Sequence, residues 1–231
     1  MKTVIDFDFG LFGRLRRDAK AVWAAYVRHP FVAALGDGTL AQPQFRNFLI
    51  QDYLFLIQYA RAYMLAAYKH DGLSDMREAM RTASMLLDVE MPLHVSYCAG
   101  WGISEAQMEA AAPSLELLAY TRFVLERGVA GDVLDLTVAL APCIMGYAEI
   151  AEILAADPAT KWEGNPYQPW IEAYLGAEYR ASVAKAILML DELGAKRGAP
   201  ARYDALLRDF TTACRLEARF WETGWHLPSE P

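Results

Sequence analysis

One cysteine of this chain has neighbours that could turn a thiol into a nucleophile. Cys143 follows Pro142 in the apolar stretch "LAPCIMGYAEI", and Tyr147 comes one helical turn later, with Glu149 two residues further on. Residues four apart share a helix face, so the thiol and the phenol belong together. A thiol of ordinary pKa, about 8.5, needs a base or a positive dipole to react well at neutral pH. Two interpretations stay open: a small buried core residue or a nucleophile in a pocket.

Asp52 is a carboxylate in an apolar setting, "LIQDYLFL". An unpaired buried carboxylate costs several kcal/mol, so we expect a dedicated partner for it. A purely structural pair, for example with Arg61, is the alternative to a role in binding.

Glu217 is a second such carboxylate, with Phe220 and Trp221 one turn later. Desolvation by these rings would raise its pKa, which suits a proton donor. The alternative is a surface glutamate paired with Arg215 or Arg219.

A metal site is possible only around Glu90 and His94, which are four residues apart and could chelate one ion. Metal sites in helical bundles usually need a Glu-x-x-His pair from each of two helices. With four histidines in the chain, we favour a hydrogen-bonded Glu90–His94 pair, and we predict neither a metal nor a cofactor.

Helical periodicity runs through the chain, and strand signals are nearly absent. The pattern predicts seven or eight helices in an all-α bundle that forms a single domain, 1–231. We expect caps at Ser74, Ser104 and Asp132, a C-terminal cap at Gly72, a kink at Pro92 and a bend at Gly176. The main segments are 11–29, 42–70, 74–99, 114–127, 132–156, 170–193 and 201–225.

Composition narrows the class of protein. The 231 residues carry a net charge of −7, and the one compact basic cluster, "RLRRDAK", is short, which argues against nucleic acid as a partner. We expect no signal peptide and no membrane span. Three cysteines without a CxxC pair favour a reducing cytoplasm.

Seven stretches occur in an order that resembles the TenA family, the type II thiaminases. The resemblance covers nearly the whole chain; single stretches are weak signals, but seven in order are specific. They are "RHPFVAALGDGTL", "FRNFLIQDYLFL", "EMPLH", "WGIS", "APCIMGYAEI", "WIEAY" and "LEARFWETGW".

The resemblance implies a haem-oxygenase-like helical fold without haem, commonly as a homotetramer. It also implies a hydrolase that cleaves the bond between an aminopyrimidine methylene and its leaving group. The substrates are 4-amino-5-aminomethyl-2-methylpyrimidine and thiamin, and the product is the hydroxymethylpyrimidine used in thiamin salvage. The preferred leaving group stays open.

Carried over position by position, the resemblance makes Cys143 the nucleophile that adds to the pyrimidine ring and Glu217 the acid that protonates a ring nitrogen. Asp52 would hydrogen-bond the ring nitrogen and the exocyclic amine. The remaining pocket residues would be Phe55, Tyr120, Tyr147, Tyr174 and Phe220. Many members have tyrosine where this chain has Phe55, which puts one hydrogen bond in doubt.

Two other functions remain alternatives. One is a metal-dependent oxidase on the same fold, for which the chain offers few ligands. The other is a non-catalytic pyrimidine-binding or regulatory protein. The presence of both Cys143 and Glu217 favours turnover.

Overall fold

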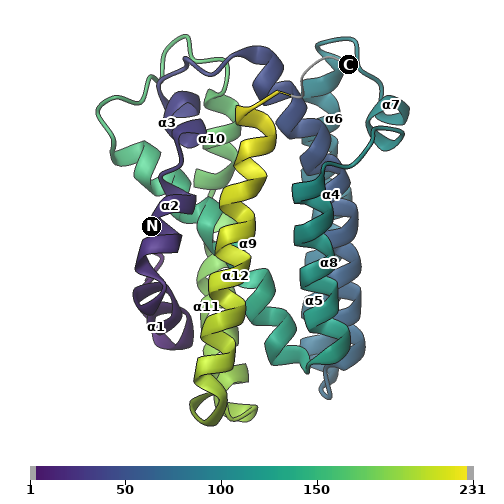
Figure 1. Ribbon diagram of the computed structural model, residues 1–231, viewed down its shortest axis with the longest axis vertical. Helices are drawn as coiled ribbons and strands as arrows, with labels where there is room; N and C mark the ends of the chain where they lie inside the picture. The colour runs from purple at the N-terminus through teal and green to yellow at the C-terminus, as the bar shows by residue number, and fades with distance from the viewer. Residues whose placement is uncertain (1–3, 228–231) are drawn as a thin grey trace. The chain divides into compact units, whose positions relative to one another are not determined.

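All regular secondary structure in the described chain is helical. The computed structural model describes residues 4–227, and within that range each regular element is an α-helix, a π-helical turn or a 3₁₀ turn (Figure 1). The prediction of an all-α protein is confirmed.

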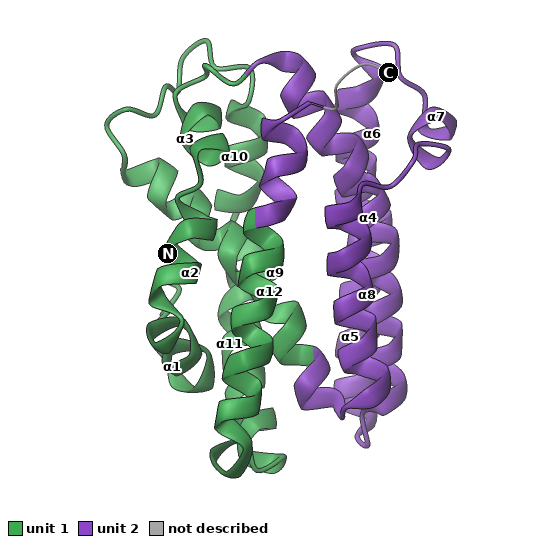
Figure 2. Cartoon of the chain, viewed as in Figure 1, with its two compact units in different colours: residues 1–40, 137–218 green, residues 41–136, 219–231 purple. Residues whose placement is uncertain are grey.

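The chain forms two compact units, each assembled from segments that are distant in sequence (Figure 2). Unit 1 comprises residues 1–40 and 137–218, and unit 2 comprises residues 41–136 and 219–231. Two helices contribute to both: α9 (Val133–Ala156) and α12 (Tyr203–Trp225).

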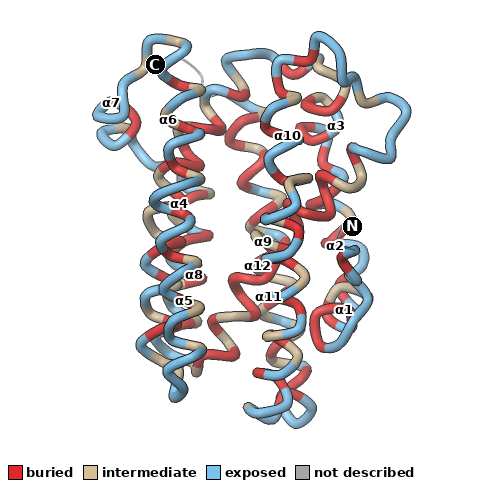
Figure 3. Tube along the Cα trace, turned by 180° about the vertical axis from the view of Figure 1, so that it is seen from behind, coloured by how far each residue is buried: buried red, intermediate tan, exposed pale blue. Residues whose placement is uncertain are grey.

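Unit 2 is organised around α4, a helix of 28 residues whose buried face recurs every three or four positions (Figure 3). Helices α5 and α8 lie along it (Figure 1). The elements wholly within this unit are α4 (Gln42–Lys69), α5 (Leu73–Met85), the π turn η1 (Leu86–Glu90), α6 (Met91–Ala99), α7 (Glu105–Glu109) and α8 (Leu115–Ala130).

Unit 1 contains shorter helices at its N-terminal end and most of α9 and α12. Helix α1 packs against α11, which also contacts α10. The elements wholly within this unit are α1 (Gly10–Asp18), α2 (Lys20–Val27), α3 (Pro30–Gly36), α10 (Gln168–Leu175), α11 (Ala177–Lys196) and the 3₁₀ turn η2 (Ala199–Arg202).

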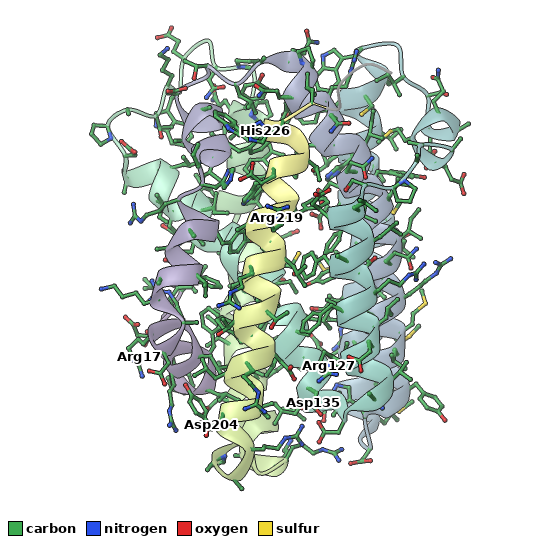
Figure 4. The ribbon with its side chains drawn as sticks, in the orientation of Figure 1. Arg17, Arg127, Asp135, Asp204, Arg219 and His226 are labelled. Carbon is green, nitrogen blue, oxygen red and sulfur yellow. The ribbon has the colours of Figure 1, made fainter. Side chains whose placement is uncertain are left out.

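Local capping chemistry sets several helix ends as the sequence predicts. The Ser104 side chain accepts from the backbone N–H of Gln107 and begins α7. Asp132 accepts from the N–H groups of Leu134 and Asp135 and begins α9 (Asp135 is labelled in Figure 4). Each such contact satisfies a donor that the first helical turn leaves unbonded.

Other ends differ from the prediction. The segment 11–29 is two helices, α1 and α2, with a break at Ala19, and Pro30 begins α3 as well as ending the preceding segment. Proline suits the first turn of a helix, because the N–H that it lacks has no intrahelical partner there. His70 is the C-cap of α4, whereas Gly72 is the N-cap of α5 and Ser74 lies inside α5.

The kink predicted at Pro92 coincides with the π turn η1 directly before α6. Pro92 has no N–H with which to continue the ordinary ladder of hydrogen bonds. The chain takes one wider turn, and the N–H of Met91 donates to the carbonyl of Leu86, five residues back. Such single π turns occur frequently at functional sites.

Helix α9 is long and apolar enough, by composition alone, to cross a membrane, but 72% of its most apolar window is buried inside the protein. That burial is typical of a core helix. Carboxylates and a thiol on such a helix therefore need a specific explanation.

Candidate active site

Asp52 is buried on α4, and its partner is a histidine. Its Oδ2 atom lies 2.6 Å from Nε2 of His94 on α6, and both side chains are about 3–4% exposed. The prediction of a dedicated partner is confirmed, but Arg61 is not that partner, because its guanidinium donates to Gln58 at 3.0 Å. Such a hydrogen-bonded partner offsets the cost of burying a carboxylate.

The other nitrogen of His94 is also engaged. Nδ1 lies 3.0 Å from the backbone carbonyl oxygen of Glu90, so the predicted Glu90–His94 pair forms through the main chain of Glu90. Burial lowers the pKa of His94, but the hydrogen bond and charge of Asp52, together with Glu90, outweigh burial and leave this pKa raised. With both nitrogens occupied, His94 is held in one orientation.

Aromatic rings follow Asp52 by one helical turn. The Phe55 ring stacks on Tyr120 of α8, with centroids 5.1 Å apart and planes at 27°, and it also contacts Phe220 of α12 at 5.6 Å. All three side chains are almost completely buried. Unit 2 therefore brings together four of the predicted site residues: one carboxylate and three flat rings.

Cys143 lies on α9 in unit 1 and is the only half-buried cysteine of the three; the other two are buried. Two tyrosine hydroxyls donate to the backbone carbonyls on either side of it: Tyr26 to Pro142 at 3.3 Å and Tyr179 to Ile144 at 2.9 Å. These contacts brace the helical turn that carries the thiol, next to the point where Pro142 interrupts the hydrogen-bond ladder.

Gly146 makes the contact of Tyr26 with this turn possible. A Cβ atom at position 146 would lie 2.2 Å from Cε1 of Tyr26, far inside any real contact distance. Glycine at this position therefore lets the Tyr26 ring lie directly against α9, where its hydroxyl reaches Pro142.

Tyr147 lies one turn beyond Cys143, as predicted, and belongs to an aromatic group. Its ring centroid is 5.2 Å from Tyr174 and 5.8 Å from Trp170, and Tyr174 is in edge contact with Tyr179 at 5.0 Å. Tyr179 thus connects this aromatic group to the backbone beside the thiol.

Glu149, two residues after Tyr147, has a structural role. Arg16 binds both of its carboxylate oxygens at 2.7 Å, and the indole N–H of Trp23 donates to it at 3.1 Å. A bidentate arginine pair of this kind is strong and geometrically fixed. This carboxylate is therefore committed to joining α1 and α2 to α9.

Glu217 is 1% exposed, so the alternative of a surface glutamate is wrong. Arg215 and Arg219 are both exposed (Arg219 is labelled in Figure 4), so they lie on a different face of α12 from the buried Glu217. Cys214 lies one turn before Glu217; burial first, and the charge of Glu217 second, raise its pKa well above the ordinary value. Glu217 is thus a buried carboxylate that lies close to a buried thiol.

Cys98 differs chemically from Cys143. Burial raises the pKa of the Cys98 thiol to about 11, despite an opposing effect of Arg46. Cys98 and Cys214 are therefore protonated at neutral pH and poor nucleophiles. Its greater exposure favours Cys143 as the reactive thiol of the chain.

The structure also identifies neighbours of the predicted site residues that the sequence did not reveal. His94 was paired with Glu90 but not with Asp52, and neither Tyr26 nor Tyr179 was connected with Cys143. These contacts join residues 35 to 116 positions apart in the sequence. The periodicity of a single helix cannot predict contacts between residues that lie so far apart. Within residues 4–227, no group of three or more His, Cys, Asp or Glu side chains is arranged to hold a metal ion.

Comparison with known proteins identifies the family. Residues 16–226 match the model of the TENA/THI-4/PQQC family. An aminopyrimidine aminohydrolase of Halalkalibacterium halodurans is 36% identical over 214 residues, which cover 92% of this chain and 94% of that protein.

Solved structures agree with this assignment. A TenA family transcription regulator from Silicibacter is 42% identical, with a TM-score of 0.86 over 94% of this chain and 98% of that one. A domain of unknown function with a haem-oxygenase-like fold, from Shewanella denitrificans, is 14% identical, with a TM-score of 0.72 over 96% of this chain and 93% of that one. The latter shows the fold alone and confirms the predicted haem-oxygenase-like architecture. The chain belongs to the TENA/THI-4/PQQC family.

Proposed function

We propose that this chain is an aminopyrimidine aminohydrolase, a type II thiaminase. It would hydrolyse the C–N bond at the methylene of 4-amino-5-aminomethyl-2-methylpyrimidine, and of thiamin, to give the hydroxymethylpyrimidine for thiamin salvage. The relatives that support this proposal include the enzyme of H. halodurans named above and the aminopyrimidine aminohydrolase of Bacillus subtilis, which is 31% identical over 91% of this chain.

The observation that carries the proposal is the arrangement around Asp52. A buried carboxylate precedes Phe55 by one turn of α4, and Phe55 lies against Tyr120 and Phe220. Flat apolar surfaces beside one buried hydrogen-bond acceptor suit a flat heteroaromatic ring that carries an amine. Such a set of residues favours a pyrimidine over an aliphatic or strongly anionic ligand.

The chemistry would come from Cys143 and Glu217. In this proposal the Cys143 thiolate adds to an electrophilic ring carbon while Glu217 gives a proton to a ring nitrogen. The electron pair of the adduct then expels the leaving group from the methylene, water takes its place there, and the thiol departs. One water is consumed, and ammonia or the thiazole is released, so the atoms balance.

Two tyrosines would orient the thiol, since the hydroxyls of Tyr26 and Tyr179 hold the carbonyls on either side of it. Tyr147 and Tyr174 form an aromatic wall on the same unit as Cys143. We also propose that the chain acts in the cytoplasm and that it forms a homotetramer. Light scattering of the purified protein would test the oligomeric state.

Steady-state kinetics with thiamin and the aminomethylpyrimidine, measured side by side, test the function. We expect turnover of both, with hydroxymethylpyrimidine as the common product by mass spectrometry. A non-catalytic regulator would bind the pyrimidine without turnover; the Silicibacter relative is named a transcription regulator. A metal-dependent oxidase would instead lose its activity with chelators and recover it with the metal ion.

A further inference from the structure

Gln51, the residue before Asp52, is a buried amide that bonds to the backbone through both its nitrogen and its oxygen. Its Nε2 donates to the carbonyl of Ala112 at 3.0 Å, and its Oε1 accepts from the N–H of Ser114 at 2.8 Å. The residue is 6% exposed. Since one amide satisfies a donor and an acceptor of the same backbone segment, it fixes both the position and the direction of that segment.

The segment that Gln51 holds is the start of α8. Ser114 is the N-cap of this helix, and its hydroxyl oxygen accepts from the N–H of Leu117 at 3.1 Å. The amide of Gln51 therefore joins α4 to the end of α8 at which helical hydrogen bonding begins. A displacement of Ser114 would be passed along α8, because the hydrogen bonds of successive turns make the helix move as one body.

Lys69, at the other end of α4, makes the corresponding contact at the other end of α8. Its ammonium donates to the carbonyl of Gly131, the C-cap residue of α8, at 2.8 Å. Between the two contacts, a Cβ atom at Gly128 would lie 2.6 Å from Cδ2 of Leu65, so glycine lets the helices approach closely there. The contacts follow one another in the same order along both helices, so α4 and α8 run parallel and are tied at both ends.

The contact made by Gln51 is the nearer of the two to the aromatic pair. Phe55 lies one turn after Gln51, and Tyr120 lies six residues after Ser114; the two rings stack with centroids 5.1 Å apart. At the helical rise per residue, Tyr120 is about 9 Å along the axis from Ser114 and about 16 Å from Gly131. The position of Tyr120 on Phe55 is therefore set mainly from the Gln51 end.

We propose that Gln51 is a positioning residue that sets the register of α8 against α4 and so holds the Tyr120 ring on Phe55, a role that deepens the proposed function and rests on it. Gln51 acts on the ligand through Tyr120, since its own hydrogen bonds go to the backbone. Stacked rings present one continuous flat surface only in a fixed register, and a displacement of about 1 Å in a binding site is enough to be measured.

Calorimetry with hydroxymethylpyrimidine and steady-state kinetics with the aminomethylpyrimidine, both well below the unfolding temperature of each variant, test this role. Gln51→Met removes both hydrogen bonds at nearly constant volume. The affinity for the product should fall about fivefold or more, and KM should rise by a similar factor. Turnover at saturating substrate should change by less than about threefold, because the aromatic surface acts in binding.

Lys69→Met is the matched control, because it removes the hydrogen bond at the far end of α8 and keeps most of the aliphatic stem. The midpoint of thermal unfolding should fall for this variant as it does for Gln51→Met. Its affinity for the product should nevertheless stay within about twofold of wild type, since Tyr120 is distant from Gly131. An equal loss of affinity in both variants would mean that affinity follows stability and not the register at Tyr120.

A double-mutant cycle separates action through Tyr120 from action through the neighbouring Asp52. Tyr120→Leu removes the ring and keeps an apolar side chain. In that background, Gln51→Met should lower the affinity for the product by less than about twofold, because the ring through which Gln51 acts is gone. A full effect of Gln51→Met in the absence of the ring would overturn the proposed role.

Gln51→Asn covers the case in which Gln51→Met does not fold. Its amide is one methylene shorter and reaches at most one of the two backbone partners, so the affinity should fall about twofold or more. A folded Gln51 variant with the affinity of wild type overturns the role of Gln51 while leaving the proposed function intact. A wild-type protein that does not bind hydroxymethylpyrimidine overturns both.

Discussion

The two units hold their polar groups in different ways. In unit 2, the carboxylate of Asp52 is fixed by a histidine that is itself fixed by a backbone carbonyl. In unit 1, the polar contacts around Cys143 go to the backbone of α9, through Tyr26 and Tyr179, and the thiol is only half-buried. In the proposed function, unit 2 would recognise the ligand and unit 1 would present the reactive atom.

This difference predicts that binding and turnover can be separated by mutation. Changes in the recognition residues of unit 2 should alter affinity first, because their hydrogen bonds exist in the ground state. Changes in Cys143 or Glu217 should alter turnover first, because in the proposed mechanism these groups act in the transition state.

Cys143→Ser should give the largest effect. A hydroxyl is a much poorer nucleophile than a thiolate at neutral pH, so turnover should fall by about a thousandfold or more, while the affinity for the product stays near that of wild type. Cys98→Ser and Cys214→Ser, at buried thiols with raised pKa values, are matched controls that should remain active. Near-normal turnover by Cys143→Ser would show that Cys143 is not the nucleophile.

Glu217→Gln comes next. Glutamine keeps a hydrogen bond to a ring nitrogen but cannot give up a proton, so turnover should fall by about a hundredfold or more. Product affinity should change little, and the alkaline limb of the rate profile should move or vanish. Glu222→Gln, at a glutamate on the same helix, is the control. Unchanged turnover and an unchanged pH profile would mean that the acid lies elsewhere.

Asp52→Asn should weaken binding of the hydroxymethylpyrimidine by about 2–4 kcal/mol, the scale of a lost buried charge-assisted hydrogen bond. If His94 takes the single amide oxygen, the NH₂ group of the introduced asparagine faces the substrate amine, donor against donor. Turnover at saturating substrate should change less than the affinity does. Calorimetry that found equal affinities for the two proteins would refute the assignment of recognition to unit 2.

The smallest expected effect is on the pH dependence of stability. The pKa of His94 is raised in the folded protein, so its pair with Asp52 stabilises the fold fully below the unfolded pKa of about 6.5. The contribution is lost as the pH rises through the folded pKa. Urea unfolding between about pH 5.5 and 9 should show the gap between wild type and His94→Gln shrinking with pH. A constant gap would show that the pair does not titrate.

The sequence alone determined the features that depend on local chemistry. Ser104 and Asp132 begin helices because their side chains satisfy backbone N–H groups two or three residues away. The length of α4 and its buried face follow from periodicity. The same local reasoning showed that Asp52 needs a partner, because desolvation of a carboxylate is costly wherever it occurs.

Only the tertiary structure decided which residues become the partners of these buried polar groups. Periodicity tells which face of a helix is buried, but it does not tell which side chain of another helix meets that face. Thus Arg61, close in sequence, was a reasonable candidate for Asp52, and His94, 42 residues away, is the partner. The tyrosines beside Cys143 are also distant in sequence, because packing depends on which helix surfaces meet and not on how far apart the residues lie along the chain. The cost of burying a polar group follows from the local sequence, whereas the packing of the helices decides which side chain becomes its hydrogen-bond partner.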